Sequence, residues 1–158
     1  MARAHLLAVL LFLALPFVPG CTDGPTAPSS DDGTGNGEAR TYEECDAIVV
    51  PFEANGTQWE AGRISCDANV PGKNTVNPTC GQPDEVELSA AANLTSGHVQ
   101  LVVEDGTGER IVDHRLEDTD GEARQVAVPS GEAGDWTLTG ERLEGFEGTY
   151  RAELACPT

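Results

Sequence analysis

The sequence predicts an all-β fold, an antiparallel β-sandwich or jelly roll of about eight short strands with two disulfides. Apolar residues alternate with polar or small ones in several short segments, which is the period of half-buried strands. Glycines and Asp-Gly or Ser-Gly pairs separate these segments, and no stretch has the period of an amphipathic helix. Short strands at this spacing are typical of sandwiches and jelly rolls.

The first two expected strands flank Asn55-Gly56, which is the strongest short signal for a two-residue hairpin turn. With these two residues as the loop, Phe52 faces Trp59 as an aromatic cross-strand pair, and Cys45 faces Cys66. The two cysteines then occupy a non-hydrogen-bonded position, where side chains on neighbouring strands approach most closely.

The other six strands are expected from the same alternation, at residues 86–94, 99–103, 110–116, 124–128, 135–143 and 149–156. Trp136 and Leu138 share the inward face of their strand. In the last strand, the face that carries Tyr150 and Leu154 also carries Cys156. Cys156 is therefore expected in the core.

Residues 1–20 are typical of an export signal peptide, because Arg3 precedes an apolar run from Leu6 to Leu15 and Gly20 precedes Cys21. The run is shorter than the ~20 residues that a transmembrane helix needs. A signal followed by cysteine at the first mature position resembles that of bacterial lipoproteins. The resemblance implies a lipid anchor on Cys21 and a place in the cell envelope, at the outer membrane or cell surface. The alternative is ordinary cleavage after Gly20, which would give a secreted protein.

The cysteine count agrees with a lipid anchor, because five cysteines leave one over in an exported protein. Setting Cys21 aside leaves Cys45, Cys66, Cys80 and Cys156, enough for two disulfides in an oxidising compartment. The hairpin register favours Cys45–Cys66 and, by elimination, Cys80–Cys156. The alternative pairs Cys66 with Cys80 and Cys45 with Cys156. No C-x-x-C spacing supports a metal site on these thiols.

Residues 21–41 are expected to form a lipid-anchored flexible linker, because they contain almost no side chain to bury. Residues 42–158 have the length of one domain. All 27 acidic residues follow Cys21, and the signal segment holds one of the nine basic residues, so the mature charge is −19, against −18 for the whole chain. This charge argues against nucleic acid and anionic membrane surfaces as partners.

No motif predicts catalysis or a cofactor. Residues 117–122 look like a calcium loop, but an EF-hand in this register needs an oxygen ligand at Leu116 and an acid at Ala127. A looser calcium site between strands is the alternative to a solvated turn. Neither His98 nor His114 accompanies a serine in a G-x-S-x-G context. We therefore expect a protein that is not an enzyme.

The segments Gly134-Asp135-Trp136-Thr137-Leu138 and Gly148-Thr149-Tyr150 resemble the closing strands of small exported β-sandwich modules of the pre-peptidase C-terminal type. Such modules carry no single activity. The expected function is a membrane-tethered binding or structural module of the cell envelope, with an envelope protein or a glycan as its partner.

The alternative function is a carbohydrate-binding module that stacks sugars on exposed aromatic rings. The candidate rings are Trp59, Trp136 and Phe146. Both tryptophans fall at positions expected in the core, so only Phe146, between two loop residues, is expected to be exposed. An envelope enzyme without a recognisable motif is a third and weaker alternative.

Overall fold

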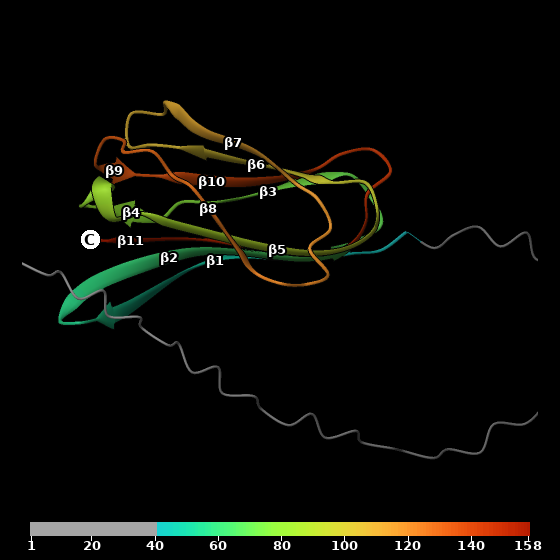
Figure 1. Cartoon of the computed structure of the whole chain (residues 1–158), viewed down its shortest axis with the longest axis horizontal. Helices are drawn as coiled ribbons and strands as arrows, with labels where there is room; N and C mark the ends of the chain where they lie inside the picture. Colours follow the sequence, from blue (N-terminus) through green and yellow to red (C-terminus); the bar gives the residue numbers. More distant parts are fainter. Residues whose placement is uncertain (1–40) are drawn as a thin grey trace, which may run out of the picture. The chain divides into compact units, whose positions relative to one another are not determined.

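The computed structural model describes residues 41–158; the signal segment, Cys21 and the linker up to residue 40 lie outside the described residues. Strands dominate the described part, and two antiparallel sheets face each other as layers (Figure 1). The elements in chain order are β1 (Glu43–Ala54), β2 (Thr57–Ala68), β3 (Gly72–Val76), β4 (Thr79–Cys80), the 3-10 turn η1 (Pro83–Glu85), β5 (Glu87–Ser96), β6 (Val99–Glu104), β7 (Arg110–Leu116), β8 (Arg124–Val126), β9 (Gly134–Asp135), β10 (Thr137–Arg142) and β11 (Glu147–Pro157).

One sheet has five strands in the order β1-β2-β11-β5-β8, and the other has four in the order β3-β10-β6-β7. The short strands β4 and β9 form a separate two-stranded ribbon. The predicted all-β antiparallel sandwich is therefore confirmed, with eleven strands instead of about eight. Among residues 41–158 no helix has the length and apolar character needed to cross a membrane.

The three additional strands are β3, β4 and β9, and none of them has a strong apolar alternation of its own. They are strands because they pair with segments that are distant in the sequence. Strand β3 pairs with β10, and β4 pairs with β9. Strand β11 spans 11 residues and is longer than the expected strand at 149–156, and β1 and β2 span 12 residues each.

The β1–β2 hairpin has the predicted register. Asn55 and Gly56 have φ values of 53° and 79°, the positive values that a two-residue type I′ turn requires. Phe52 pairs with Trp59 and Cys45 with Cys66. The turn residues alone therefore determine which side chains of β1 and β2 lie opposite each other.

The core lies between the two sheets, and the predicted inward faces form it. Trp136, Leu138, Leu154 and Cys156 have no solvent-exposed surface. The rest of the core cluster comes mainly from alternate residues of β2, β5, β6, β7 and β11: Ile64, Cys66, Ala68, Val76, Cys80, Leu88, Ala90, Ala92, Val99, Leu101, Val103, Val112, Leu116, Phe146, Tyr150 and Ala152.

Two disulfides join Cys45 to Cys66 and Cys80 to Cys156, the first of the two arrangements considered above. Cys45–Cys66 links β1 to β2 near the end opposite the hairpin turn. Cys80–Cys156 links the ribbon strand β4 to the end of β11, and both its cysteines are fully buried. Each disulfide therefore fastens an element that lies at the margin of a sheet.

Two expectations about the aromatic residues are wrong. Phe146 is 2% exposed, because its ring packs edge-on against Tyr150, with ring centroids 6.1 Å apart. Trp59 is half-buried instead of belonging to the core. Its side chain lies on the face of β2 opposite to the buried Cys66 and Ile64, and alternation along a strand cannot say which of two apolar faces meets the second sheet.

Candidate functional site

The five-stranded sheet has one face turned away from the second sheet, which we call the outer face. On β2, Ile64 and Cys66 point into the core, so the odd-numbered residues of β2 lie on the outer face. The strand pairing places the even-numbered residues of β1 and the odd-numbered residues of β11 beside them. The candidate site lies on this face.

An accessible aromatic pair stands near the turn end of the outer face. The rings of Phe52 and Trp59 are stacked, with centroids 5.9 Å apart and an angle of 30° between their planes. Phe52 is 36% exposed and Trp59 is half-buried. We call these two rings the aromatic platform. Each ring covers one face of the other, and the remaining surface of both rings is partly accessible to solvent.

Apolar neighbours extend the aromatic platform on both sides. Pro157 of β11 pairs with Trp59, and Val50 and Ile48 follow Phe52 on the same face of β1. Ile48 is 53% exposed, the highest exposure among the large hydrophobic residues that are accessible in residues 41–158. Pro157 is buried, so the accessible apolar area lies on the β1–β2 hairpin.

Local contacts hold the platform in place. The turn Asn55-Gly56 closes one end of the hairpin and the Cys45–Cys66 disulfide closes the other. The backbone N–H of Thr158 donates a 3.0 Å hydrogen bond to the carbonyl oxygen of Gln58, next to Trp59. The rings therefore stand on a hairpin that is closed at both ends, and its strand β2 is also bonded to the residue that follows β11.

A polar depression of about 600 Å³ lies at the other end of the three strands. Its outward side chains are three carboxylates, two hydroxyls and one guanidinium. The residues that line it are Glu43, Glu44, Cys45, Asp46, Ser65, Cys66, Asp67, Thr149, Tyr150 and Arg151. Carboxylates and hydroxyls side by side can accept and donate hydrogen bonds to a ligand that carries several hydroxyl groups.

Tyr42 lies next to Asp67 of this depression. Partial burial raises the pKa of Tyr42 above its ordinary value, and the negative charge of Asp67 raises it further. The phenol therefore stays protonated throughout the physiological range, and it can donate a hydrogen bond.

An exposed ion pair separates the platform from the depression. The Arg63 Nε and Glu153 Oε2 atoms are 2.5 Å apart, with side-chain exposures of 48% and 39%. Trp59, Arg63 and Asp67 are spaced four residues apart on the same face of β2, so they mark a line of about 25 Å. Only an extended ligand could touch both ends of this line.

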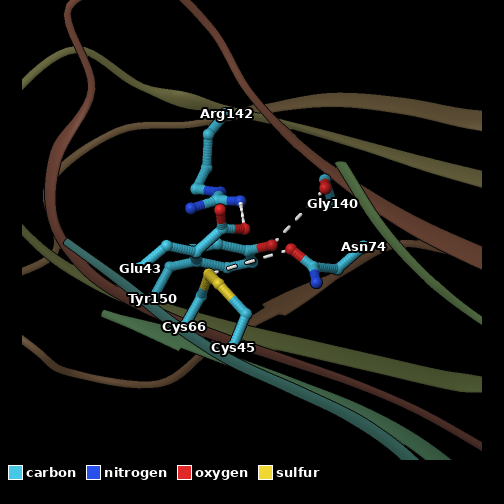
Figure 2. A network of polar contacts seen from close by, with 7 residues as sticks. All are labelled: Glu43, Cys45, Cys66, Asn74, Gly140, Arg142 and Tyr150. Atoms are coloured by element: carbon cyan, nitrogen blue, oxygen red, sulfur yellow. Dashed lines mark hydrogen bonds and ion pairs between the residues drawn. A yellow bond between two sulfur atoms is a disulfide. The ribbon is translucent and has the colours of Figure 1, made fainter. Parts of the chain in front are cut away.

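A second polar cluster lies inside the sandwich (Figure 2). Arg142 of β10 has a fully buried side chain, and its Nη2 atom lies 2.5 Å from Glu43 Oε1. Its guanidinium also lies 5.9 Å from the centre of the Phe146 ring. Asn74 Oδ1 is 3.8 Å from the Cys66 sulfur, and Tyr150 donates a 3.4 Å hydrogen bond to the carbonyl oxygen of Gly140. This cluster connects the two sheets, and Glu43, its carboxylate, is partly exposed.

One carboxylate has a strongly shifted pKa, and its role is structural. Asp105 is 3% exposed, and four hydrogen bonds occupy its oxygens, from Glu132 N, from Thr107 N and Oγ1, and from Glu109 N. These donors, the backbone N–H of Glu132 first, lower the pKa of Asp105 to about 2. A carboxylate that stays ionised and fully hydrogen-bonded organises two loops and is unsuited to proton transfer at neutral pH.

The turn at residues 117–122, which looks like a calcium loop, is fastened to β5. The Thr119 hydroxyl donates to the carbonyl oxygen of Ala92 and accepts from the Ala92 N–H. Asp118 Oδ1 accepts hydrogen bonds from the backbone N–H groups of Leu94 and Asp120. These side-chain oxygens therefore bind backbone groups of β5 and of the turn itself. Residues 41–158 contain no group of three or more His, Cys, Asp or Glu that could hold a metal ion.

The histidines do not belong to the candidate site. His114 pairs with Leu101 at a half-buried position of β7, and His98 precedes β6. Sequence reasoning named Trp59 as a candidate but missed its partner Phe52 as a binding residue. The Asn55-Gly56 register, which already placed the two rings side by side, was the signal that could have found it.

Comparison with known proteins gives only distant likenesses. No protein-family model matches this chain, and no curated protein does. A solved structure of a family 29 carbohydrate-binding module covers 72% of this chain and 80% of its own, with 11% identity and a TM-score of 0.29. A second structure of that family covers 75% of this chain and 93% of its own, with 11% identity and a TM-score of 0.30.

The structure of Drosophila melanogaster CENP-C bound to CAL1 covers 70% of this chain and 76% of its own, with 8% identity and a TM-score of 0.27. Likenesses of this degree do not establish a common fold or function. The function must therefore be inferred from the residues of this chain.

Proposed function

We propose that this protein is a membrane-tethered, non-enzymatic binding module of the bacterial cell envelope, and that it binds its ligand on the outer face of β1, β2 and β11. The accessible aromatic platform of Phe52 and Trp59 carries this proposal. The tether rests on the signal pattern that ends at Cys21 and on the linker that follows it.

A carbohydrate is the ligand class that suits this surface. Sugar rings have apolar faces that stack on aromatic side chains, and their hydroxyl groups bond to carboxylates and hydroxyls. The platform supplies the first kind of contact, and Glu44, Asp46 and Asp67 of the polar depression supply the second. An extended glycan chain would reach from one to the other.

A non-enzymatic role agrees with the chemistry of the described residues. The lining of the polar depression contains neither a histidine nor a free thiol, since Cys45 and Cys66 form a disulfide. Its carboxylates share an open surface without a positioned base and nucleophile.

The first experiment is a binding screen of the purified full-length protein against glycans, including peptidoglycan fragments and soluble β-glucans, followed by calorimetric titration of any ligand found. We expect the double variant Phe52→Ala/Trp59→Ala to bind about tenfold to a hundredfold more weakly, because both stacking surfaces are lost. Phe52→Tyr, which keeps the ring, should bind like the parent protein.

Thermal unfolding of each variant by circular dichroism provides the control for folding, since loss of the cross-strand pair also weakens the hairpin by about 0.5–1 kcal/mol. If no glycan binds the parent protein, the ligand class is wrong. If a glycan binds equally well after both rings are removed, the outer face near the turn is not the binding surface.

A further inference from the structure

The two main sheets of the sandwich have four edge strands, and three of these are protected against pairing with another chain. Strand β8 is only three residues long. Strand β7 carries Arg110, Asp113 and Arg115, and β3 carries Lys73 and directly follows Pro71. Short length, charges and a flanking proline are the usual devices that keep an edge from pairing.

The fourth edge strand, β1, differs from the others. It is 12 residues long and lies on the outside of the five-stranded sheet (Figure 1). Ile48 is 53% exposed on one of its faces and Val49 is 39% exposed on the other. A long, apolar edge strand that is accessible on both faces is a template for an additional strand.

The backbone of β1 offers hydrogen-bonding groups along this edge. Residues that flank a two-residue turn form a hydrogen-bonded pair, so Ala54 and the other even-numbered residues of β1 bond to β2. The N–H and C=O groups of Cys45, Ala47 and Val49 then point away from the sheet, and no described strand pairs with them. Pro51, which lacks an N–H, ends this run.

The charges along β1 indicate what kind of segment would fit. Glu44 and Asp46 lie near one end of the strand and Glu53 at the other, and β1 contains no lysine or arginine. Glu43 is already paired with the buried Arg142. The nearest cation across the hairpin, Arg63, is already paired with Glu153. An apolar centre flanked by acids is complementary to an apolar segment flanked by bases.

We propose that the open edge of β1 binds an extended segment of a partner protein, with alternating apolar residues at its centre and lysine or arginine at its ends. The segment would add a sixth strand to the five-stranded sheet. Backbone hydrogen bonds to residues 45–49 would supply affinity, and the acids at both ends would select the charge pattern. This surface is the edge of β1, distinct from the aromatic platform on its outer face.

A second copy of this chain is a poorer occupant. Antiparallel pairing of two β1 strands about Ile48 places Glu43 opposite Glu53 of the other copy, and like charges directly opposite each other destabilise a sheet. The net charge of the mature chain, −19 by the count above, adds repulsion at longer range.

The test uses a synthetic peptide with blocked ends, Lys-Arg-Val-Thr-Val-Thr-Val-Arg-Lys, and the purified full-length protein. Calorimetric titration should show binding that weakens with salt. A peptide with proline at the central valine keeps the charge but cannot form a continuous strand, and it should bind at least tenfold more weakly.

Two variants at one position separate strand addition from charge attraction. Val49→Pro removes an N–H that points away from β2, so the hairpin should survive as it does at Pro51, whereas peptide binding should fall at least tenfold. Val49→Ala keeps the N–H and should retain binding. Hydrogen exchange of the Ala47 and Val49 amides in the parent protein, which needs no variant to fold, should slow when the peptide is added.

Equal peptide binding by Val49→Pro and Val49→Ala would overturn the proposal, and so would unchanged exchange at Ala47 and Val49. Sedimentation without peptide detects self-association. If self-association alone protects the same amides, the edge binds a second copy of this chain, and the proposal is overturned as well. Failure of glycan binding leaves this test unaffected, because the Val49 variants do not alter the rings of the platform.

Discussion

At the scale of single residues, the sandwich contains one buried positive charge with few partners. The side chain of Arg142 is fully buried, and its Nε and Nη1 atoms make no hydrogen bond within the structure. Glu43, which is half-exposed at the start of β1, is its carboxylate partner, and the Phe146 ring lies beside it (Figure 2). The free energy of burying this guanidinium therefore depends strongly on one carboxylate, that of Glu43.

A nearby glycine makes room for the same cluster. A Cβ atom at Gly140 would lie 2.5 Å from the Tyr150 hydroxyl oxygen, so only glycine allows Tyr150 to reach the four-stranded sheet. Burial raises the pKa of Tyr150 to about 12. Its hydroxyl therefore stays protonated and keeps its hydrogen bond to the Gly140 carbonyl oxygen.

We expect Glu43→Ala to lower the free energy of unfolding by about 1–3 kcal/mol, because it leaves a buried guanidinium without its carboxylate. Glu153→Ala is the matched control. It removes an ion pair of the same 2.5 Å length whose two side chains are both exposed, and it should cost at most about 1 kcal/mol. Urea unfolding of the two variants measures both changes in unfolding free energy. Equal losses of stability would contradict the burial of the Arg142 guanidinium.

At the scale of elements, the two disulfides should contribute unequally to stability. Cys45–Cys66 spans 21 residues of a hairpin that the turn already brings together, whereas Cys80–Cys156 spans 76 residues. The entropy that a cross-link removes from the unfolded chain grows with the length of the loop it closes, which gives about 3 kcal/mol for the short loop and about 4–5 kcal/mol for the long one.

The double variants Cys45→Ala/Cys66→Ala and Cys80→Ala/Cys156→Ala test this difference by denaturant unfolding. The second should be the less stable by about 1 kcal/mol, with a further cost because both of its cysteines are fully buried. Peptide mapping of the parent protein without reduction should find the two bridged pairs directly. A Cys66–Cys80 peptide would refute the pairing on which the comparison depends.

At the scale of the whole molecule, the proposed tether depends on residues outside the described part of the chain. The linker has the composition of a flexible coil and would hold the acidic sandwich away from an anionic membrane surface. Ligands in the envelope would then reach the proposed binding surface on β1, β2 and β11 without contact between the domain and the lipid.

We expect the protein from the membrane fraction of its native host to have the mass of a chain that starts at Cys21 and carries a diacylglyceryl group. Reduction should add two hydrogen atoms for each of the two disulfides. Cys21→Ser should shift the protein to the soluble fraction without altering its thermal unfolding. An unlipidated parent chain in the medium would remove the tether from the proposal.

The sequence by itself determined the features that depend on near neighbours along the chain. The Asn55-Gly56 turn determined the register of β1 and β2, and therefore the Phe52–Trp59 stack and the apposition of Cys45 and Cys66. Alternating apolar residues determined the core faces of β5, β6, β7, β10 and β11. These predictions succeed because turn geometry and the two-residue period of a strand are local properties.

Only the tertiary structure decided which face of β2 meets solvent, whether the loop residue Phe146 is buried, and which strands form an edge. Phe146 is a loop residue by sequence, yet the fold buries it between Tyr150 and Arg142. Trp59 is partly accessible because the second sheet covers the opposite face of β2. Strands β3, β4 and β9, and the open edge of β1, exist because of pairing between distant segments. Strand order, and burial at these positions, depend on contacts between residues far apart in the chain, which local patterns do not encode.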